Sequence, residues 1–187
     1  MAPELRYEIY TRKYHDECVA LLSDAFTQRS EPVGNHIPYE SGAIQYFFDY
    51  YLKQADQQNM STVCIDEGTG KAVGVAVSYD FNEDPPDDSF LEILTTKWDP
   101  LWFPQVFAIM EALEETARKT LPDGKGIGWY IFLIGVSAEY CNLGIGSRLV
   151  AENIQLAKER GFAFALADCT NDYSTKCFQK HGFEVQK

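Results

Sequence analysis

The sequence predicts an α/β fold in which helices cover a central β-sheet. Residues 129–136 are almost all apolar, which is typical of a central strand whose two faces are both covered. A glycine-containing turn follows, and residues 145–160 then show the apolar spacing of an amphipathic helix. Strand-like and helix-like segments alternate along the rest of the chain.

The composition fits one globular domain. The chain has 187 residues, of which 45% are hydrophobic and 14% aromatic, enough to bury a sizeable core. We therefore expect a single domain over residues 1–187. No apolar run approaches the roughly 20 residues that span a membrane, and residues 1–6 are too polar for a signal peptide, so we expect a cytoplasmic protein without a membrane partner.

Charge and cysteine content narrow the possible partners. A net charge of −12 disfavours nucleic-acid binding and suits a cationic substrate better. There are only three histidines, and the five cysteines lack C-x-x-C spacing, so we expect no metal site and no disulfide framework. We expect reduced, mostly buried thiols at Cys18, Cys64, Cys141, Cys169 and Cys177.

The N-terminal half reads as a strand, two helices and a hairpin. Residues 7–10 alternate as a short strand. Apolar residues then recur at i, i+3, i+4 and i+7 over 18–25, and helical spacing returns over 41–58, with a loop between the two helices. A Gly-Thr-Gly turn separates two apolar runs at 62–66 and 71–80, which predicts a β-hairpin.

A loop and a helix are predicted next. Residues 83–88 contain two prolines and four acids, which excludes a helix or a central strand. They form either a solvated turn or an acidic lip that attracts amines. A helix follows that ends before Pro122, with a stripe that we assign to the core rather than to a ligand site: Phe103, Val106, Phe107, Met110, Leu113 and Ala117.

The last third continues the alternation of strands and helices. The helix over 145–160 has one apolar and one charged face and stops at Gly161. A strand is predicted over 162–168, a short helix over 174–181 and the start of a last strand over 183–186.

The turn within residues 134–147 has the features of an anion-binding loop. Gly144 and Gly146 carry no Cβ, so the backbone can approach a ligand, and the first N–H groups of the following helix lack intrahelical partners. A pyrophosphate suits such a site, although a turn made for packing alone is the alternative. The Rossmann pattern fails because its third glycine is Leu149 here, and no Gly-Lys pair is followed by Ser or Thr as a Walker loop requires.

This stretch resembles the acetyl-coenzyme A loop of the GNAT superfamily of N-acetyltransferases. The family pattern Q/R-x-x-G-x-G/A reads Cys141-Asn142-Leu143-Gly144-Ile145-Gly146 here, with Cys141 in place of Gln or Arg. A second family motif is matched by Asn171 and by Phe178-Gln179-Lys180-His181-Gly182-Phe183. The resemblance implies a mixed central sheet flanked by helices, with a strand-loop-helix cradle for acetyl-coenzyme A. The chain ends at Lys187, where the family normally adds one more strand, so we expect the C-terminal strand to be missing.

The resemblance also implies which residues contact the cofactor. By it, acetyl-coenzyme A is bound by Val136, Cys141, Asn142, Leu143, Gly144, Ile145, Gly146, Ser147 and Asn171. Many family members use a Tyr as general acid at the position of Phe178, which has no proton to give. The usual acid is therefore absent.

A narrower resemblance, to insect arylalkylamine N-acetyltransferases, supplies other candidates. It rests on Glu31-Pro32 and on two hydroxyl residues four apart, Thr170 and Ser174. It implies that Glu31 is the general base through a water molecule, that Ser174 protonates the thiolate and that Thr170 relays protons. The alternatives are an ordinary loop acid at Glu31, and a helix-capping role for Thr170 or Ser174, which Asn171 or Asp172 would serve equally well.

We therefore expect an enzyme that moves an acetyl group from acetyl-coenzyme A to a primary amine by direct attack in a ternary complex. The expected acceptor is a small-molecule arylalkylamine, and the protein a monomer or weak dimer. A polyamine, an amino acid or a protein amine remains an alternative acceptor, because the glycine loop reports only the cofactor. A non-catalytic acyl-coenzyme A binder is the second alternative.

Overall fold

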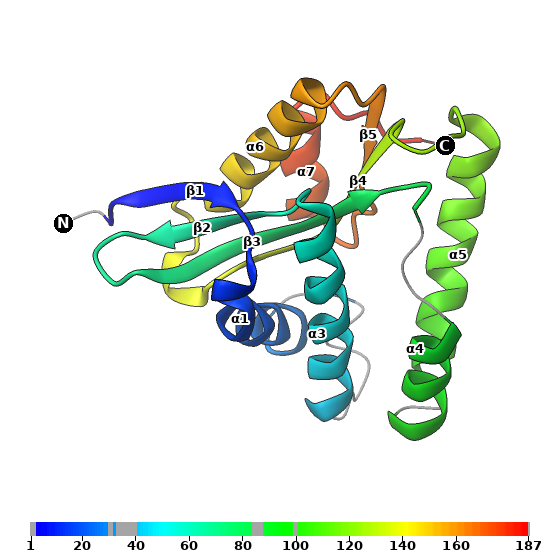
Figure 1. Ribbon diagram of the computed structural model, residues 1–187, viewed down its shortest axis with the longest axis horizontal. Coiled ribbons are helices and arrows are strands. Elements are labelled where there is room, and N and C mark those ends of the chain that lie inside the picture. The colour runs from blue at the N-terminus through cyan, green and yellow to red at the C-terminus, as the bar shows by residue number, and fades with distance from the viewer. Residues whose placement is uncertain (1–2, 30–31, 33–40, 84–87, 99–100, 187) are drawn as a thin grey trace.

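The computed structural model describes residues 3–29, 32, 41–83, 88–98 and 101–186 (Figure 1). Its centre is a five-stranded sheet with the strand order β1-β2-β3-β4-β5. Neighbouring strands are antiparallel except β4 and β5, which are parallel. The sheet is therefore mixed, as predicted. Its strands are β1 (Leu5–Ile9), β2 (Thr62–Asp66), β3 (Lys71–Asp80), β4 (Gly128–Val136) and β5 (Phe164–Leu166).

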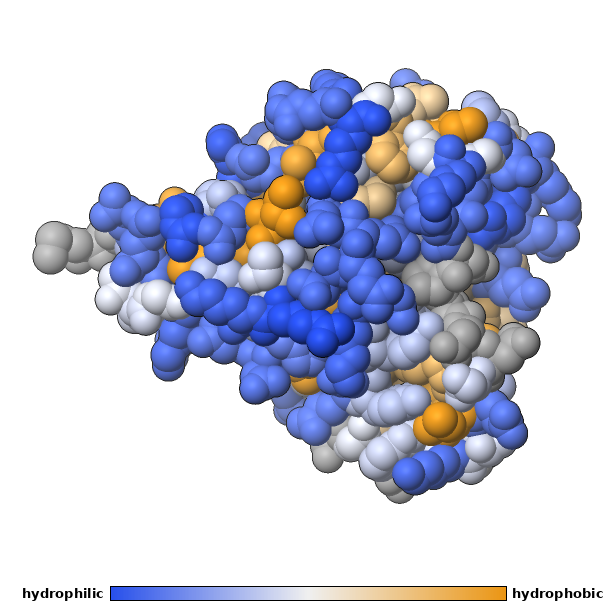
Figure 2. Space-filling view, in the orientation of Figure 1, coloured by the Kyte–Doolittle hydropathy of each residue, from blue (hydrophilic) through white to orange (hydrophobic). Residues whose placement is uncertain are grey.

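Helices cover both faces of this sheet. Helices α1 (His15–Thr27) and α3 (Ser41–Gln58) pack on one face, and α6 (Ile145–Glu159) and α7 (Asp172–Lys180) lie on the other (Figure 1). The remaining elements are η1 (Arg12–Tyr14), α4 (Asp88–Ile93), η2 (Leu94–Trp98), α5 (Phe103–Thr120) and η3 (Ala138–Tyr140). Among the described residues, no helix combines the length and apolar character needed to cross a membrane. The face seen in Figure 2 is mainly hydrophilic.

The two-sided burial of the sheet explains the apolar run in β4. Tyr130 and Leu133 belong to the core that includes α1 and α3. Trp129 and Ile131 belong to a second core under α6 and α7. Because successive side chains of a strand point to opposite faces, both faces of β4 have to be apolar.

A glycine on β3 fixes how closely α6 approaches the sheet. A Cβ placed on Gly74 would lie 2.7 Å from Cγ2 of Ile145 and 3.3 Å from Cδ1 of Leu149. The absence of that atom lets the first turn of α6 pack directly on the β3 backbone. The N-terminus of α6 is thereby held at the end of β4.

A buried amide ties α6 to three strands. Asn153 is 0% exposed. Its Oδ1 accepts hydrogen bonds from Ser78 Oγ (2.7 Å) and Trp129 Nε1 (3.2 Å), and its Nδ2 donates to Thr62 Oγ1 (2.7 Å) and to the Leu149 carbonyl (2.9 Å). These bonds use the full capacity of the amide, so the buried polar group is satisfied and sets the position of the helix.

Strand β4 parts from β5 after the first third of its length. Val77 pairs with Leu133 and Ser78 with Ile131, so Phe132 is an extra residue on β4 and forms a β-bulge. Strand β5 pairs only with the first three residues of β4, Gly128 to Tyr130. From there to Val136, this edge of β4 has no strand partner in the described part of the chain. An opening remains between the two strands.

The structure corrects two predicted strands and one predicted loop. The described residues 183–186 form no strand, because Phe183 turns back, donates its N–H to the Phe178 carbonyl (3.3 Å) and packs against the Phe178 ring with centroids 4.9 Å apart. The strand predicted over 162–168 is restricted to Phe164–Leu166. Residue 88, predicted as the end of a loop over 83–88, instead begins a helical stretch that runs through η2 to Trp98, and residues 84–87 of that loop lie outside the described residues.

The assignment of the α5 stripe to the core rather than to a ligand site is only partly correct. Of the predicted stripe, Phe103 is buried and Phe107 and Ala117 pack against the core, but Leu113 is 48% exposed. The helix stands away from the sheet (Figure 1). Several of its apolar side chains line a pocket instead, among them Val106 and Met110.

We predict that Asn153→Leu destabilises the fold, although leucine has the same branched shape and the same number of heavy atoms. The substitution leaves Ser78, Thr62 and Trp129 without their partner, and each unsatisfied buried group costs about 1–3 kcal/mol. We expect the free energy of unfolding in urea to fall by about 2–5 kcal/mol. Gln155→Leu, at an exposed position of the same helix, is the control. A change below about 0.5 kcal/mol, the size of an ordinary surface substitution, would contradict this role.

Candidate functional site

The loop after β4 presents free backbone N–H groups at the start of α6. Gly144 is the N-cap residue, with φ 77°, a left-handed conformation that favours glycine. The first hydrogen bond of the helix runs from Arg148 N to the Gly144 carbonyl (3.0 Å). The N–H groups of Ile145, Gly146 and Ser147 therefore have no intrahelical acceptor. Together with the helix dipole they form a site that suits an anion.

The space around the two glycines favours a ligand over simple packing. A Cβ on Gly144 would meet no atom within 4 Å, and one on Gly146 would meet only Val136 Cγ2 at 3.9 Å. Protein packing therefore does not require Gly146 to be small. The open space in front of these residues fits the close approach of a ligand to the backbone, as a diphosphate-binding loop requires.

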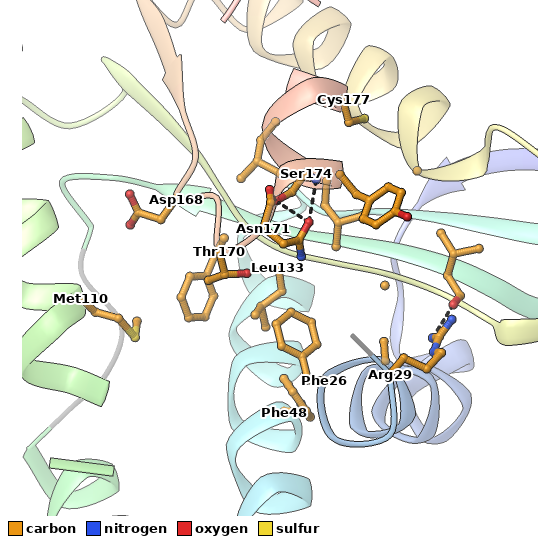
Figure 3. A pocket seen from close by; sticks show the side chains of 18 of the residues that line it. Phe26, Arg29, Phe48, Met110, Leu133, Asp168, Thr170, Asn171, Ser174 and Cys177 are labelled. Atoms are coloured by element: carbon orange, nitrogen blue, oxygen red, sulfur yellow. Dashed lines mark hydrogen bonds between the residues drawn. The ribbon is translucent and has the colours of Figure 1, made fainter. Parts of the chain in front are cut away.

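A pocket of about 590 Å³ lies beside the loop (Figure 3), within the size range of small-molecule sites. It extends between α1, α3, α5, β4 and α7, and Gly146 forms part of its wall. The walls are mainly apolar, and aromatic and sulfur-containing side chains dominate, among them Phe26, Phe47, Phe48, Phe103, Phe132, Met110 and Phe178.

Asp168 and Arg29 are the two charged side chains among the described residues of this lining. Asp168 follows β5, and its Oδ2 accepts a hydrogen bond from Tyr130 OH (2.6 Å). Residue 168 as a whole is exposed, but burial of its carboxylate raises its pKa, while the Tyr130 hydrogen bond acts in the opposite direction. The pKa of the buried Tyr130 is raised by burial and by the nearby carboxylate. Figure 3 shows Asp168 on the same side of the pocket as Met110.

The N-terminus of α7 contributes the polar wall of the pocket. Asn171 caps this helix, because its Oδ1 accepts from Ser174 N (2.9 Å). The Ser174 hydroxyl lies 2.9 Å from the Asn171 carbonyl and 3.2 Å from Oδ1. Thr170 is not the cap, so a capping role for it is wrong. Thr170, Asn171 and Ser174 all line the pocket (Figure 3).

Arg29 reaches the end of β4 from the turn after α1. Its Nη2 donates to the Val136 carbonyl (2.6 Å), and its Nη1 donates to Cys141 Sγ (3.2 Å). Its Nε lies 3.1 Å from Asp24 Oδ2, close enough for an ion pair, but makes no hydrogen bond of good geometry to a described residue.

The expectation of mostly buried thiols is wrong. All five cysteines are free, but only Cys18 and Cys64 are buried, whereas Cys141 and Cys169 are exposed. Cys141 lies in the turn after η3 and lines the pocket, and Cys169 lies in the loop between β5 and α7. Among the described residues, no cluster of three or more His, Cys, Asp or Glu side chains could hold a metal ion.

The structure places the predicted cofactor residues in two groups. Val136, Cys141, Gly146 and Asn171 line the pocket. The side chains of the others are not in the lining. Ile145 points into the core, and Ser147 Oγ is hydrogen-bonded to His181 Nε2 (2.9 Å). Asn142 lies in the loop with a positive φ of 64°. Leu143 is exposed outside the pocket lining. For Ile145 and Ser147, the backbone N–H is therefore the group available to a ligand.

Of the predicted catalytic residues, Ser174 and Thr170 lie in the pocket, and Glu31 lies outside the described residues. Asp168 and Arg29 were missed. Asp168 is the last residue of the strand predicted over 162–168. An acidic residue at the end of a strand is a signal for a site that could have been used. Arg29 contacts Cys141 from 112 residues away, and no local pattern connects the two.

Comparison with known proteins places this geometry in a family. The sequence pattern of the acetyltransferase (GNAT) family matches residues 15–183. Among solved structures, the fold is similar to the C-terminal condensation domain of Ebony in complex with beta-alanyl-dopamine (TM-score 0.83, 16% identity, 98% of this chain and 84% of that chain).

The fold is also similar to arylalkylamine N-acetyltransferase 2 from Aedes aegypti (TM-score 0.73, 21% identity, 96% and 82% of the two chains). A further similar fold is the polyamine N-acetyltransferase of Drosophila melanogaster (TM-score 0.73, 18% identity, 98% and 85%). The predicted resemblance and the α/β fold are thus confirmed. The chain belongs to the acetyltransferase (GNAT) family.

Proposed function

We propose that this chain transfers an acetyl group from acetyl-coenzyme A to the primary amine of an arylalkylamine, as a single domain over residues 1–187. The observation that carries the proposal is one apolar pocket that has a glycine loop at one side and one carboxylate, Asp168, in its wall. Members of the family transfer acetyl groups from acetyl-coenzyme A. The loop suits the donor, and the rest of the pocket suits the acceptor.

The donor side is supported by the backbone. The N–H groups of residues 145–147 would hold the diphosphate, because they have no intrahelical acceptor and lie at the positive end of the α6 dipole. The edge of β4 beyond Tyr130 has no strand partner among the described residues. A ligand arm that contains amide groups can hydrogen-bond along such an edge in the way an added strand does. This edge leads from the loop into the pocket.

The acceptor side favours an aromatic monoamine over the alternatives. An aromatic body gains free energy by contact with the phenyl walls, and its single ammonium group matches Asp168, the one carboxylate among the described residues of the lining. A polyamine would place a second charge among apolar side chains, where an unpaired charge costs several kcal/mol. An amino acid would bring its own carboxylate toward Asp168. The acidic chain, with net charge −12, also attracts amines at long range.

The residues implied by the family resemblance are proposed for proton transfer. The attacking amine has to be neutral, and the departing thiolate needs a proton. Glu31 would take the proton from the amine through water, and Ser174 would protonate the thiolate with Thr170 as relay. The hydroxyls of Ser174 and Thr170 lie on the pocket wall, which supports this assignment, whereas Phe178 at the position of the usual Tyr offers no proton.

The test is the release of free coenzyme A thiol from acetyl-coenzyme A with a panel of amines. The panel contains β-phenylethylamine, tryptamine, dopamine, agmatine, spermidine, an amino acid, a lysine peptide and a blank without amine. We expect saturable release with the arylalkylamines and a kcat/KM at least about tenfold lower with the polyamines, equivalent to about 1.4 kcal/mol. Coenzyme A binding without turnover of any amine would instead support the non-catalytic binder, which Phe178 and Cys141 favour.

We predict that Gly146→Val blocks coenzyme A without unfolding the protein. A Cβ fits sterically at Gly146, and valine has no lower helix propensity than glycine. The added methyl groups fill the space that a ligand needs to approach the backbone. We expect the Kd of coenzyme A to rise at least about tenfold, with an unchanged melting temperature. Lys158→Val, at an exposed position of the same helix, is the control, and an unchanged Kd in Gly146→Val would exclude the loop as the binding site.

We predict that Glu31→Gln lowers kcat with the best arylalkylamine by about 10²- to 10⁴-fold, the usual effect of losing a general base. The Kd of coenzyme A, measured by calorimetry, should not change. The control is Glu159→Gln, which neutralises an exposed acid at the far end of α6. A wild-type kcat in Glu31→Gln would remove this residue from the mechanism.

We predict that Asp168→Asn weakens amine binding and stabilises the protein at neutral pH. Loss of a charge-assisted hydrogen bond costs about 1.5–3 kcal/mol, so the KM for the arylalkylamine should rise roughly 10- to 150-fold. The amide oxygen can still accept the Tyr130 hydrogen bond. Asp172→Asn, outside the pocket lining, is the control, and an unchanged KM in Asp168→Asn would exclude Asp168 as the amine's partner.

The stability effect of Asp168→Asn has a defined pH dependence. The pKa of Asp168 is raised in the folded state, so the folded protein binds more protons than the unfolded chain, and the charged carboxylate costs stability as pH rises through that window. The gain in melting temperature from Asn should therefore be largest at pH 7 and disappear below the unfolded pKa of about 3.9. A gain that does not depend on pH would contradict desolvation as its cause.

A further inference from the structure

Arg29 lies at the coenzyme A loop although it belongs to a distant part of the chain. Its guanidinium bridges the Val136 carbonyl (2.6 Å) and Cys141 Sγ (3.2 Å), and the bond to Val136 is visible in Figure 3. It therefore touches both the last residue of β4 and the first residue of the glycine motif. Its side chain is 27% exposed, so it is held in place by contacts and still accessible from the pocket.

The position that Arg29 contacts is where this chain departs from its family pattern. The motif Q/R-x-x-G-x-G/A begins with Gln or Arg, and here the first residue is Cys141. A neutral thiol supplies neither a positive charge nor a fork of donors. The guanidinium of Arg29 supplies both at that thiol, from another element. Arg29 is the only cation among the described residues that line the pocket.

The guanidinium of Arg29 retains N–H groups that can donate to an anion. A guanidinium has five N–H donors, and here two of them donate to Val136 O and Cys141 Sγ. Nε is buried and makes no hydrogen bond of good geometry to a described residue. Asp24 is the single carboxylate in ion-pair distance among the described residues. Such a group binds phosphate oxygens in bidentate fashion.

A second arginine near the loop also has a carboxylate partner, and it differs from Arg29 in its position. Arg148, in the first turn of α6, forms an ion pair with Glu152 (2.6 Å) and lies over the Tyr7 ring at 5.8 Å. It is not part of the pocket lining. In a chain of net charge −12, a polyanionic ligand therefore depends strongly on the local charge at Arg29.

We propose that Arg29 binds the diphosphate of coenzyme A and replaces in space the basic residue that the motif lacks at Cys141. The inference rests on the proposed function, since it assumes that the loop binds coenzyme A. Arg29 would act as a ligand-binding residue that joins the turn after α1 to the loop, so donor binding would also fix the end of α1 against β4.

The test measures the Kd of coenzyme A and of pantetheine, which lacks the diphosphate, for the wild type and for Arg29→Gln. We expect the Kd of coenzyme A to rise about 10- to 100-fold, as for the loss of a charged hydrogen bond, while the Kd of pantetheine changes less than about twofold. The Kd of coenzyme A for Arg29→Lys should lie between the values for the wild type and for Arg29→Gln, because lysine keeps the charge but not the forked arrangement of N–H donors.

Two further variants make the test specific. Arg160→Gln is the matched control, because Arg160 also donates to a backbone carbonyl, that of Asn59 (2.7 Å), but lies outside the pocket lining. The double variant Arg29→Gln/Cys141→Arg returns an arginine to the motif position and should restore coenzyme A binding to within about threefold of the wild type. Melting temperatures of all variants show that each is folded.

Each result decides the question. An unchanged or lower Kd of coenzyme A in Arg29→Gln, an equal loss of pantetheine and coenzyme A binding, or no rescue by Cys141→Arg would overturn the inference. These outcomes leave the proposed function intact as long as the wild type binds coenzyme A. A wild type that does not bind coenzyme A would instead overturn the proposed function itself.

Discussion

The structure depends on the buried amide of Asn153. Its hydrogen bonds to β2, β3, β4 and the α6 backbone fix the helix on the sheet, and Gly74 allows the helix to sit at that distance. The N–H groups without an intrahelical acceptor lie at the N-terminus of α6. Their position therefore depends on how firmly this helix is held on the sheet. The Asn153 amide would be costly to bury without hydrogen bonds, and its four hydrogen bonds offset that cost. The amide thereby sets the position of the loop.

The pocket results from the parting of two parallel strands. The bulge at Phe132 and the early end of β5 open the sheet beside β4, and α5 closes the far side with apolar residues. Asp168 lines this opening, where partial burial of its carboxylate raises its pKa. The hydrogen bond from Tyr130 offsets part of that effect on the pKa. A desolvated carboxylate kept in an apolar wall is typical of a binding site for a cation.

The sequence alone predicted the regular elements and the loop well, because these depend on local patterns. The helix over Ser41–Gln58 and the strands Thr62–Asp66 and Lys71–Asp80 have the predicted bounds. The spacing of α5 was read correctly as helical, but the same apolar stripe serves a core or a pocket wall equally well. Arg29 and Asp168 became visible only in three dimensions, since their partners lie 107 and 38 residues away in the chain.

Amide-resolved NMR during titration with coenzyme A tests the central claim most directly, because it reports each backbone N–H separately. If the loop and the β4 edge bind the donor, the amide signals of Ile145, Gly146 and Ser147 show the largest chemical-shift changes. The signals at the end of β4 show the next largest changes, and the signals of β1 do not shift. Saturable binding that leaves the first turn of α6 unshifted, or no binding at all, would contradict the account.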